Sequence, residues 1–145
     1  MLPSNGAGSH GQAGHAGTVP MTMRKDAATA AAEIVLAVEK HCAGTPGLVG
    51  TVGKLEVPNG AINVIPGRCD LTIDVRAGDD EVRDAALTRV LGDIRTIAAR
   101  RGVGAEIRQM MNAGAAPCSP EMQRKLARSI HKITGDAAPR HLPSG

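Results

Sequence analysis

Three polar residues stand beside glycines or at a strand end, where side chains that do chemistry are often found. His15 lies in "GHAGT", Asn63 in "AINVIPG" and Arg76 in "DVRA". A histidine can donate a hydrogen bond to an oxygen that gains negative charge, an asparagine amide both donates and accepts, and an arginine fork suits a carboxylate. A second interpretation stays open, because turn histidines, turn asparagines and solvated arginines are common. Spacing alone does not show that the three side chains converge.

Other kinds of catalytic site find little support in the sequence. The histidines form no HExxH or HxH pattern, and no G-x-S-x-G elbow is present. Three cysteines without a close pair (Cys42, Cys69 and Cys118) favour thiols in a reducing cytoplasm over a disulfide framework. We therefore expect neither a metal site nor a nucleophilic triad within these residues.

The composition limits the kinds of partner. The 145 residues are 42% hydrophobic, contain no Phe, Tyr or Trp, and carry a net charge of +3. Without aromatic side chains, bases of single-stranded nucleic acid cannot stack, and the arginines form no single basic block. No apolar run is long enough to cross a bilayer. We expect a protein that binds neither nucleic acid nor membrane.

The patterning predicts three helices and three clear strands. Helices are expected at 24–42, 79–100 and 119–134, and strands at 48–57, 68–77 and 103–111. In "CDLTIDVR" the residues alternate, which places Cys69, Leu71, Ile73 and Val75 in the core and Arg76 on the polar face. The expected buried helix faces are Ala27, Ala31, Ile34 and Val38; Val82, Ala86, Val90, Ile94 and Ile97; and Met122, Leu126, Ile130 and Ile133.

The order of these elements predicts an α+β fold. It fits a ferredoxin-like antiparallel sheet with two helices on one face, followed by an extra C-terminal helix. The first strand would have to come from the opening residues, whose Gly, Ser and Asn show no period. We expect residues 1–10 to be a flexible or non-native leader and the first strand to be frayed or missing. The glycine spacing of "GAGSHG" is interpreted as flexible sequence, not as a dinucleotide site.

Three motifs, in order, resemble one enzyme family: "GQAGHAGTVPMTMRKDA", "GLVGTVGKLEVPNGAINVIPG" and "CDLTIDVRAGDD". They are similar to the lid domain of the dinuclear-metal amidohydrolases related to aminopeptidases. The branch is that of N-carbamoyl-L-amino-acid hydrolase, allantoate amidohydrolase and β-ureidopropionase, the hydantoinase/carbamoylase amidases. The resemblance implies that residues 11–114 are the lid and dimerisation domain and that 115–145 return into the catalytic domain.

The resemblance also implies roles for the three polar residues. His15 would reach into the partner subunit's active site and stabilise the oxyanion, while Asn63 and Arg76 would bind the substrate carboxylate. The lid would form a homodimer through its sheet edge and a helix, and the substrate would be a small ureido acid. The family uses two divalent metal ions, zinc or manganese, whose ligands and general-base glutamate lie in a catalytic domain that these residues lack.

The sequence therefore predicts part of an enzyme that hydrolyses the C–N bond of N-carbamoyl amino acids or allantoate, with the chain alone inactive. Two alternatives remain open. One is a ferredoxin-like dimerisation module without chemistry, which an unpaired sheet edge would favour. The other is the lid of a related metallo-aminopeptidase.

Overall fold

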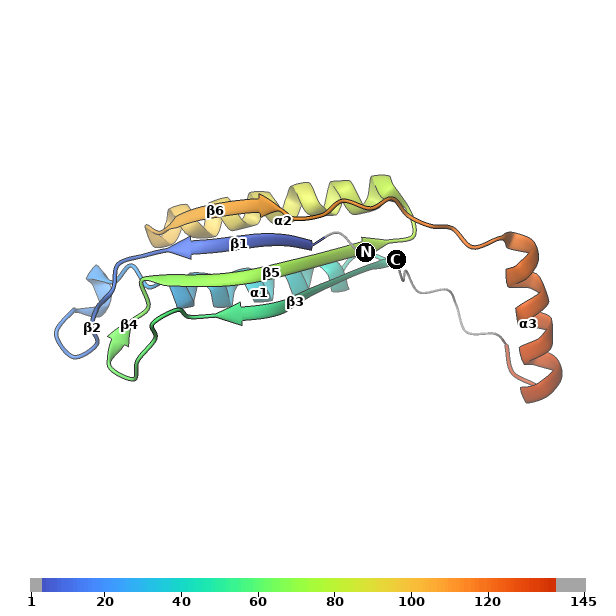
Figure 1. Ribbon diagram of the computed structural model, residues 1–145, viewed down its shortest axis with the longest axis horizontal. Coiled ribbons are helices and arrows are strands. Elements are labelled where there is room, and N and C mark those ends of the chain that lie inside the picture. The colour runs from blue at the N-terminus through green and yellow to red at the C-terminus, as the bar shows by residue number, and fades with distance from the viewer. Residues whose placement is uncertain (1–3, 138–145) are drawn as a thin grey trace.

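The computed structural model describes residues 4–137 and shows a two-layer α+β fold with a separate C-terminal helix (Figure 1). Its large sheet is antiparallel with the strand order β3-β5-β1-β6, and a small two-stranded ribbon joins β2 to β4. The elements are β1 (Ser4–His10), β2 (Gly14–His15), the 3-10 helix η1 (Met21–Met23), α1 (Ala27–Ala43), β3 (Leu48–Glu56), β4 (Val64–Ile65), β5 (Arg68–Ala77), α2 (Asp80–Arg101), β6 (Gly104–Gln109) and α3 (Pro120–Thr134).

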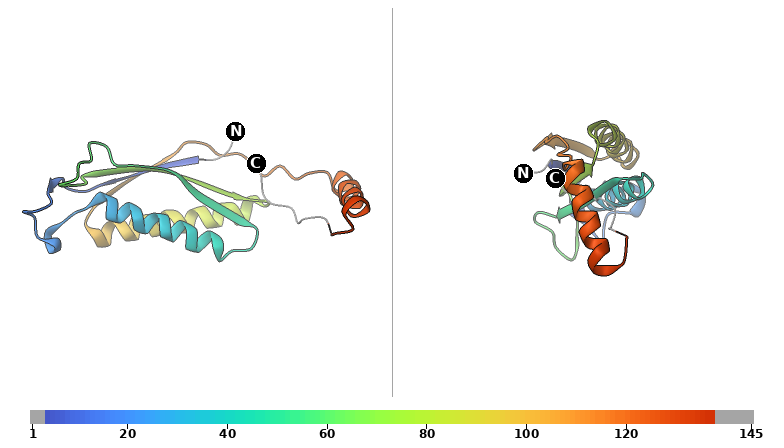
Figure 2. Two further views of the ribbon diagram at one scale, coloured as in Figure 1. Left: turned by 90° about the horizontal axis from the view of Figure 1, so that it is seen from below. Right: turned by 90° about the vertical axis from the view of Figure 1, so that its right-hand side faces the viewer.

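The predicted ferredoxin-like arrangement is confirmed. The chain runs β1-α1-β3-β5-α2-β6 around the large sheet, which is the split βαβ order. Helices α1 and α2 both lie on one face of the sheet, and the other face is open (Figure 2). We call this sheet with its two helices the body.

The prediction of a leader without structure is wrong for residues 4–10. They form β1, which lies inside the sheet and pairs with both β5 and β6. Residues 1–3 lie outside the described residues. Strand propensity does not predict β1, because Gly, Asn and Ser are poor strand formers. The strand is held by ladder bonds on both sides and by small inward side chains, with Ala7 and Ser9 buried and the Ser9 hydroxyl donating to the Ala27 carbonyl at 2.9 Å.

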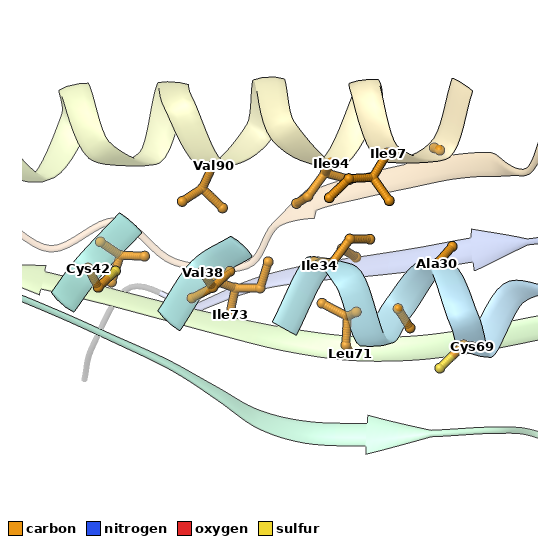
Figure 3. Packing of buried hydrophobic residues seen from close by; sticks show 14 of the residues in the cluster. Ala30, Ile34, Val38, Cys42, Cys69, Leu71, Ile73, Val90, Ile94 and Ile97 are labelled. Carbon is orange, nitrogen blue, oxygen red and sulfur yellow. The ribbon is translucent and has the colours of Figure 1, made fainter. Parts of the chain in front are cut away.

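The core lies between the two helices and the inner face of the sheet (Figure 3). The alternation predicted for β5 is confirmed, with Cys69, Leu71, Ile73 and Val75 all buried. The alanines of α1 allow that helix to lie close to the sheet, and Ala27, Ala30 and Ala31 are fully buried. At the other end of α1, Cys42 fills the space above Gly50, where a Cβ would lie 2.3 Å from the cysteine sulfur. Small residues therefore replace the missing aromatic ones by bringing the layers close together.

Helix α2 departs from its predicted face at one position. Val82 is 38% exposed, and Arg83 is buried in its place. The guanidinium of Arg83 donates to Asp80 at 2.5 Å, to Asp84 at 2.8 Å and to the Ala113 carbonyl at 2.6 Å. These three acceptors offset the cost of burying the guanidinium charge. The spacing of apolar residues cannot predict that an arginine is buried in this way.

Helix α3 lies apart from the body, beyond a long connection from β6 (Figures 1 and 2). Its predicted start and end are confirmed, with Pro120 in the first turn and Gly135 at a φ of 76° after the last. Its predicted apolar stripe is exposed to solvent, including Met122, Leu126 and Ile133. The stripe is therefore not part of the core of the body.

Candidate functional site

His15, in β2, and Asn63, which directly precedes β4, lie together at the end of the molecule that carries the small ribbon of β2 and β4 (Figure 1). In the ribbon His15 pairs with Val64, and the Ala16 N–H donates to the Asn63 carbonyl at 2.8 Å. We call residues 11–25 and 57–67 the tip. The structure thus brings together two of the three residues that the sequence singled out.

Glycines permit the close approach of the strands within the tip. A Cβ on Gly67 would lie 2.9 Å from the Ala13 nitrogen, and one on Gly11 would lie 1.9 Å from the Lys25 carbonyl oxygen. The Gly11 N–H donates to the Gly67 carbonyl at 2.9 Å, which ties the two halves of the tip together. Backbone contacts of this kind exclude any larger residue at these two positions.

The imidazole of His15 is held by the turn that follows it. The Gly17 N–H donates to Nδ1 of His15 at 3.0 Å. A peptide N–H can only donate, so Nδ1 must be the unprotonated nitrogen, and the neutral ring carries its proton on Nε2. The His15 side chain is exposed, so it presents an Nε2–H donor on the surface of the tip.

Asn63 is exposed beside His15. Its backbone carbonyl is used by Ala16, and its side-chain amide makes no hydrogen bond to another residue of the range 4–137. The amide is therefore available to a ligand as donor and acceptor.

Arg76 lies at the opposite end of the large sheet. It is next to last in β5, whose first residue, Arg68, pairs with His10 near the tip. At about 3.3 Å per residue, the eight positions from Arg68 to Arg76 extend about 26 Å. Within one chain, therefore, the structure does not bring Arg76 together with His15 and Asn63.

The guanidinium of Arg76 is already paired. Its Nε and Nη2 both donate to Oδ2 of Asp74, at 2.9 and 2.7 Å, and this bond raises the pKa of Arg76. Oδ1 of Asp74 is enclosed and has no partner among residues 4–137. Asp74 was not among the residues predicted from the sequence, although it lies two residues before Arg76 on the same face of the strand, which was a usable signal. Asp74 orients the fork and leaves the Nη1 side of Arg76 for a ligand.

The open face of the sheet carries a shallow hollow that contains none of these three residues. It has a volume of about 240 Å³ and lies over Gly6 and Gly8 of β1. Ion pairs surround it, including Arg68–Asp70 at 2.9 Å and Arg108–Glu106 at 2.6 Å. Its charged side chains are paired with one another, which leaves the hollow without a strong field of either sign.

No group of three or more His, Cys, Asp or Glu side chains within residues 4–137 is arranged to hold a metal ion. The described residues therefore do not fit the metal pair that the sequence resemblance implies, and its ligands would have to come from elsewhere. The three cysteines are free thiols. None of the helices in the described range is long and apolar enough to cross a membrane.

The comparisons with known proteins agree with the fold. The family described as "Peptidase dimerisation domain" matches residues 6–102. N-carbamoyl-L-amino-acid amidohydrolase of Pseudomonas sp. (strain NS671) is 36% identical over 129 residues, 88% of this chain and 31% of that protein. A probable allantoate deiminase of Oryza sativa subsp. japonica is 37% identical over 147 residues, 89% of this chain and 30% of that protein.

Solved structures resemble the whole chain. A hydantoinase/carbamoylase family amidase from Burkholderia ambifaria superposes with a TM-score of 0.87 at 30% identity, covering 99% of this chain and 35% of that one. The chain thus spans about a third of the length of the relatives that it matches. Because the family match covers residues 6–102, more than half of the chain, the chain belongs to the peptidase dimerisation domain family, in the group whose relatives are carbamoylase and allantoate amidohydrolases.

Proposed function

We propose that this chain is the lid and dimerisation part of an amidohydrolase that cleaves the C–N bond of N-carbamoyl amino acids or allantoate. The observation that carries the proposal is the presentation of His15, which is exposed on the tip and whose Nδ1 accepts from the Gly17 N–H, so that the neutral ring keeps its proton on Nε2. The names of the relatives supply the substrate class, a ureido group attached to a carboxylic acid. The metal ions of such an enzyme, zinc or manganese, would be bound outside the described residues.

His15 acts in this proposal as a donor to the ureido carbonyl oxygen. When water adds to that carbon, the oxygen gains negative charge, and a donor that is already in place stabilises it more than a mobile one does. The Nε2–H of a neutral imidazole is such a donor. The role needs no other group in the chain to act as acid or base, and among residues 4–137 the ring has one hydrogen bond, from the Gly17 N–H.

Asn63 and Arg76 are proposed to bind the substrate carboxylate. The amide of Asn63 offers an N–H beside His15, and Arg76 offers the free side of its fork. The separation of about 26 Å along β5 means that one chain cannot bring Arg76 and His15 to one small substrate. A complete site with all three residues therefore requires two chains.

A twofold dimer meets this requirement. The edges of the sheet are β3 and β6, and each presents unpaired backbone groups on its outer side. When two copies of one edge strand pair antiparallel, the end of the first chain that bears His15 lies along the end of the second that bears Arg76. We propose a homodimer through such an edge, with the adjacent helix adding contact area.

We also propose that residues 115–145 begin the return into the catalytic domain, which 11–114 would cover as the lid. The separate position of α3 and its exposed Met122, Leu126 and Ile133 support this boundary. A helix with such a stripe buries it against another element when one is present.

The test uses a full-length relative whose lid is replaced by residues 4–114 of this chain. His15→Ala should lower kcat about 100-fold to 1000-fold with the dimer retained, which is the loss seen when one oxyanion donor is removed. Asn63→Ala and Arg76→Ala should act mainly on KM. Full turnover by the His15→Ala enzyme would favour a dimerisation module that takes no part in chemistry.

Mixed dimers test the shared site. At substrate concentrations well below the raised KM, subunits with His15→Ala and subunits with Arg76→Ala each have little activity in the proposal, but a mixed dimer has one site in which both residues are intact. Random mixing should therefore restore about a quarter of the normal activity, since half the dimers are mixed and half of their sites work. No restoration would show that His15 and Arg76 of one chain serve the same site.

The isolated chain gives a further check. Purified residues 1–145 should not turn over N-carbamoyl amino acids when Zn²⁺ or Mn²⁺ is added. Measurable hydrolysis would contradict the proposal that the catalytic groups lie elsewhere.

A further inference from the structure

We propose that Arg24 is the positioning residue of His15. Its guanidinium holds closed the turn whose Gly17 N–H fixes the tautomer of the His15 ring. The consequence for turnover rests on the function proposed above for His15, but the effect on the ring does not.

The contacts of Arg24 are with the backbone of this turn. Nη2 donates to the Ala16 carbonyl at 2.5 Å, and Nε donates to the Val19 carbonyl at 3.0 Å. These two carbonyls lie on either side of Gly17 and Thr18, so one planar group bridges the turn at its two ends. Charged donors form stronger hydrogen bonds than neutral ones, so this bridge holds the turn more firmly than its own backbone bonds would.

Arg24 forms no ion pair in the described part of the chain. It is half-buried, and none of the ion pairs found among residues 4–137 includes it. A partly buried guanidinium without a carboxylate needs other acceptors, and the carbonyls of Ala16 and Val19 are the ones that it has. The hydrogen bonds of its guanidinium are therefore made to the turn after His15.

The remaining bonds of the turn are weaker. Thr18 and Val19 donate their N–H groups to the His15 carbonyl, both at 3.2 Å. If the Arg24 bridge is lost, the start of the turn is still held by the Ala16 bond to Asn63, but Gly17 to Val19 are held by these long bonds and the Gly17 bond to Nδ1. The imidazole is then free to rotate or to move its proton to Nδ1, and in either case the outward Nε2–H donor is lost for part of the time.

The local sequence explains why Arg24 can reach back. The pattern predicted a helix from residue 24, but α1 begins at Ala27, capped by Asp26, whose carboxylate accepts from the Ala28 N–H at 2.9 Å. Arg24 therefore lies outside the helix, with extended backbone at a φ of −74° and a ψ of 134°. Its side chain is free to fold over the preceding turn.

The experiment is nitrogen NMR of the His15 ring in the 145-residue chain, at alkaline pH where the imidazole is neutral. The unmodified chain should show the Nε2–H form alone. Arg24→Gln should shift the ring nitrogens toward the mixture seen in unstructured histidine, and should speed exchange of the Val19 amide about tenfold. Arg24→Lys replaces the planar guanidinium with a single ammonium group, so its ring nitrogen shifts and Val19 exchange rate should lie between those of the unmodified chain and Arg24→Gln.

Arg68→Gln is the matched control. Arg68 lies at the same end of the sheet and pairs with Asp70 at 2.9 Å, but makes no hydrogen bond to the turn. Its removal should leave the His15 ring unchanged. A ring that keeps the Nε2–H form in Arg24→Gln, with unchanged exchange at Val19, would overturn the inference.

A second measurement covers the case in which Arg24→Gln does not fold. In the unmodified chain, a coupling across the hydrogen bond should be observed between Arg24 Nε and the Val19 carbonyl carbon, and its absence would overturn the inference. Both measurements read the ring and the turn directly. A failure of the proposed function would appear instead as full turnover of the His15→Ala enzyme, so the two outcomes are distinguishable.

Discussion

The body and the tip of this molecule are built by different forces. The body buries a continuous set of Ile, Val, Leu, Cys and Ala side chains between two helices and a sheet. In the tip Ile65 is the one buried hydrophobic side chain, while Met21, Met23 and Ile62 are exposed. The tip takes its shape from glycines, backbone hydrogen bonds and the fork of Arg24. Stability resides in the body, and the precise placement of a donor resides in the tip.

The largest effect is expected in the body. Ile73 is 1% exposed at the centre of β5, under both helices. Ile73→Ala removes three carbons from a site that cannot collapse easily, and should cost about 2–5 kcal/mol of unfolding free energy. Urea denaturation measures the loss, with exposed Val82→Ala as the control. A cost below that of the control would mean that this core is not close-packed.

The next largest effect is expected where tip and body join. Gly11→Ala would place a Cβ 1.9 Å from the Lys25 carbonyl oxygen, so the backbone must move, at about 1–3 kcal/mol. Gly78→Ala, which meets no atom within 4 Å, is the control. Thermal unfolding compares the two variants. Equal melting temperatures would show that the tip is joined loosely to the body.

A smaller effect depends on pH and belongs to the outer surface of the body. The hydrogen bond from Arg101 to Glu33 links α2 to α1 and lowers the pKa of the Glu33 carboxyl. A lowered pKa in the folded state gives stability that is present above the unfolded pKa and is lost as the pH falls through the folded one. Glu33→Gln should therefore lower stability at neutral pH and flatten its decline in acid. Urea midpoints at neutral and acid pH measure the stability and its decline with falling pH. If Glu33→Gln loses stability in acid as steeply as the unmodified chain does, the result would contradict the pairing of Glu33 with Arg101.

The smallest effect is expected for the exposed side chains of the tip. Ile62 is fully exposed, so Ile62→Ala should change the unfolding free energy by no more than about 0.5 kcal/mol. Urea denaturation of Ile62→Ala and of Ile73→Ala gives the two losses of unfolding free energy, and their difference measures the contrast between tip and body. A loss above 1 kcal/mol, on the order of a core substitution, would show that the tip is buried in solution.

Periodicity predicted the parts of the fold that apolar burial determines. The alternation in β5 and the spacing in α1 both follow from a side chain meeting a core, and both were confirmed. The strand β1 could not be found in this way, since glycines and serines carry no apolar period and its partners are distant in the sequence. Arg83 was missed for a related reason, because its burial depends on acceptors supplied by Asp80 and Ala113.

The candidate site was predictable in its residue types but not in its geometry. The sequence selected His15, Asn63 and Arg76, and their proposed roles await the experiments above. Their separation into two ends of the sheet follows from strand order and register, which local patterns do not contain. The tautomer of His15 depends on one backbone N–H, and the fork of Arg24 on two carbonyls. Such contacts come from the fold of a loop and have no signature in hydrophobic spacing.

The place of β1 in the sheet has a consequence for how the domain is made. Within this domain the strand comes before all the other elements, yet its two neighbours are β5 and β6, about 60 and 100 residues later. Until both have been synthesised, the strand has no partner, and closing such long loops delays folding. The helices and the β3–β5 hairpin can form earlier from local contacts. The domain should therefore acquire its native sheet late, in a step that joins the first strand of the domain, β1, to its last, β6.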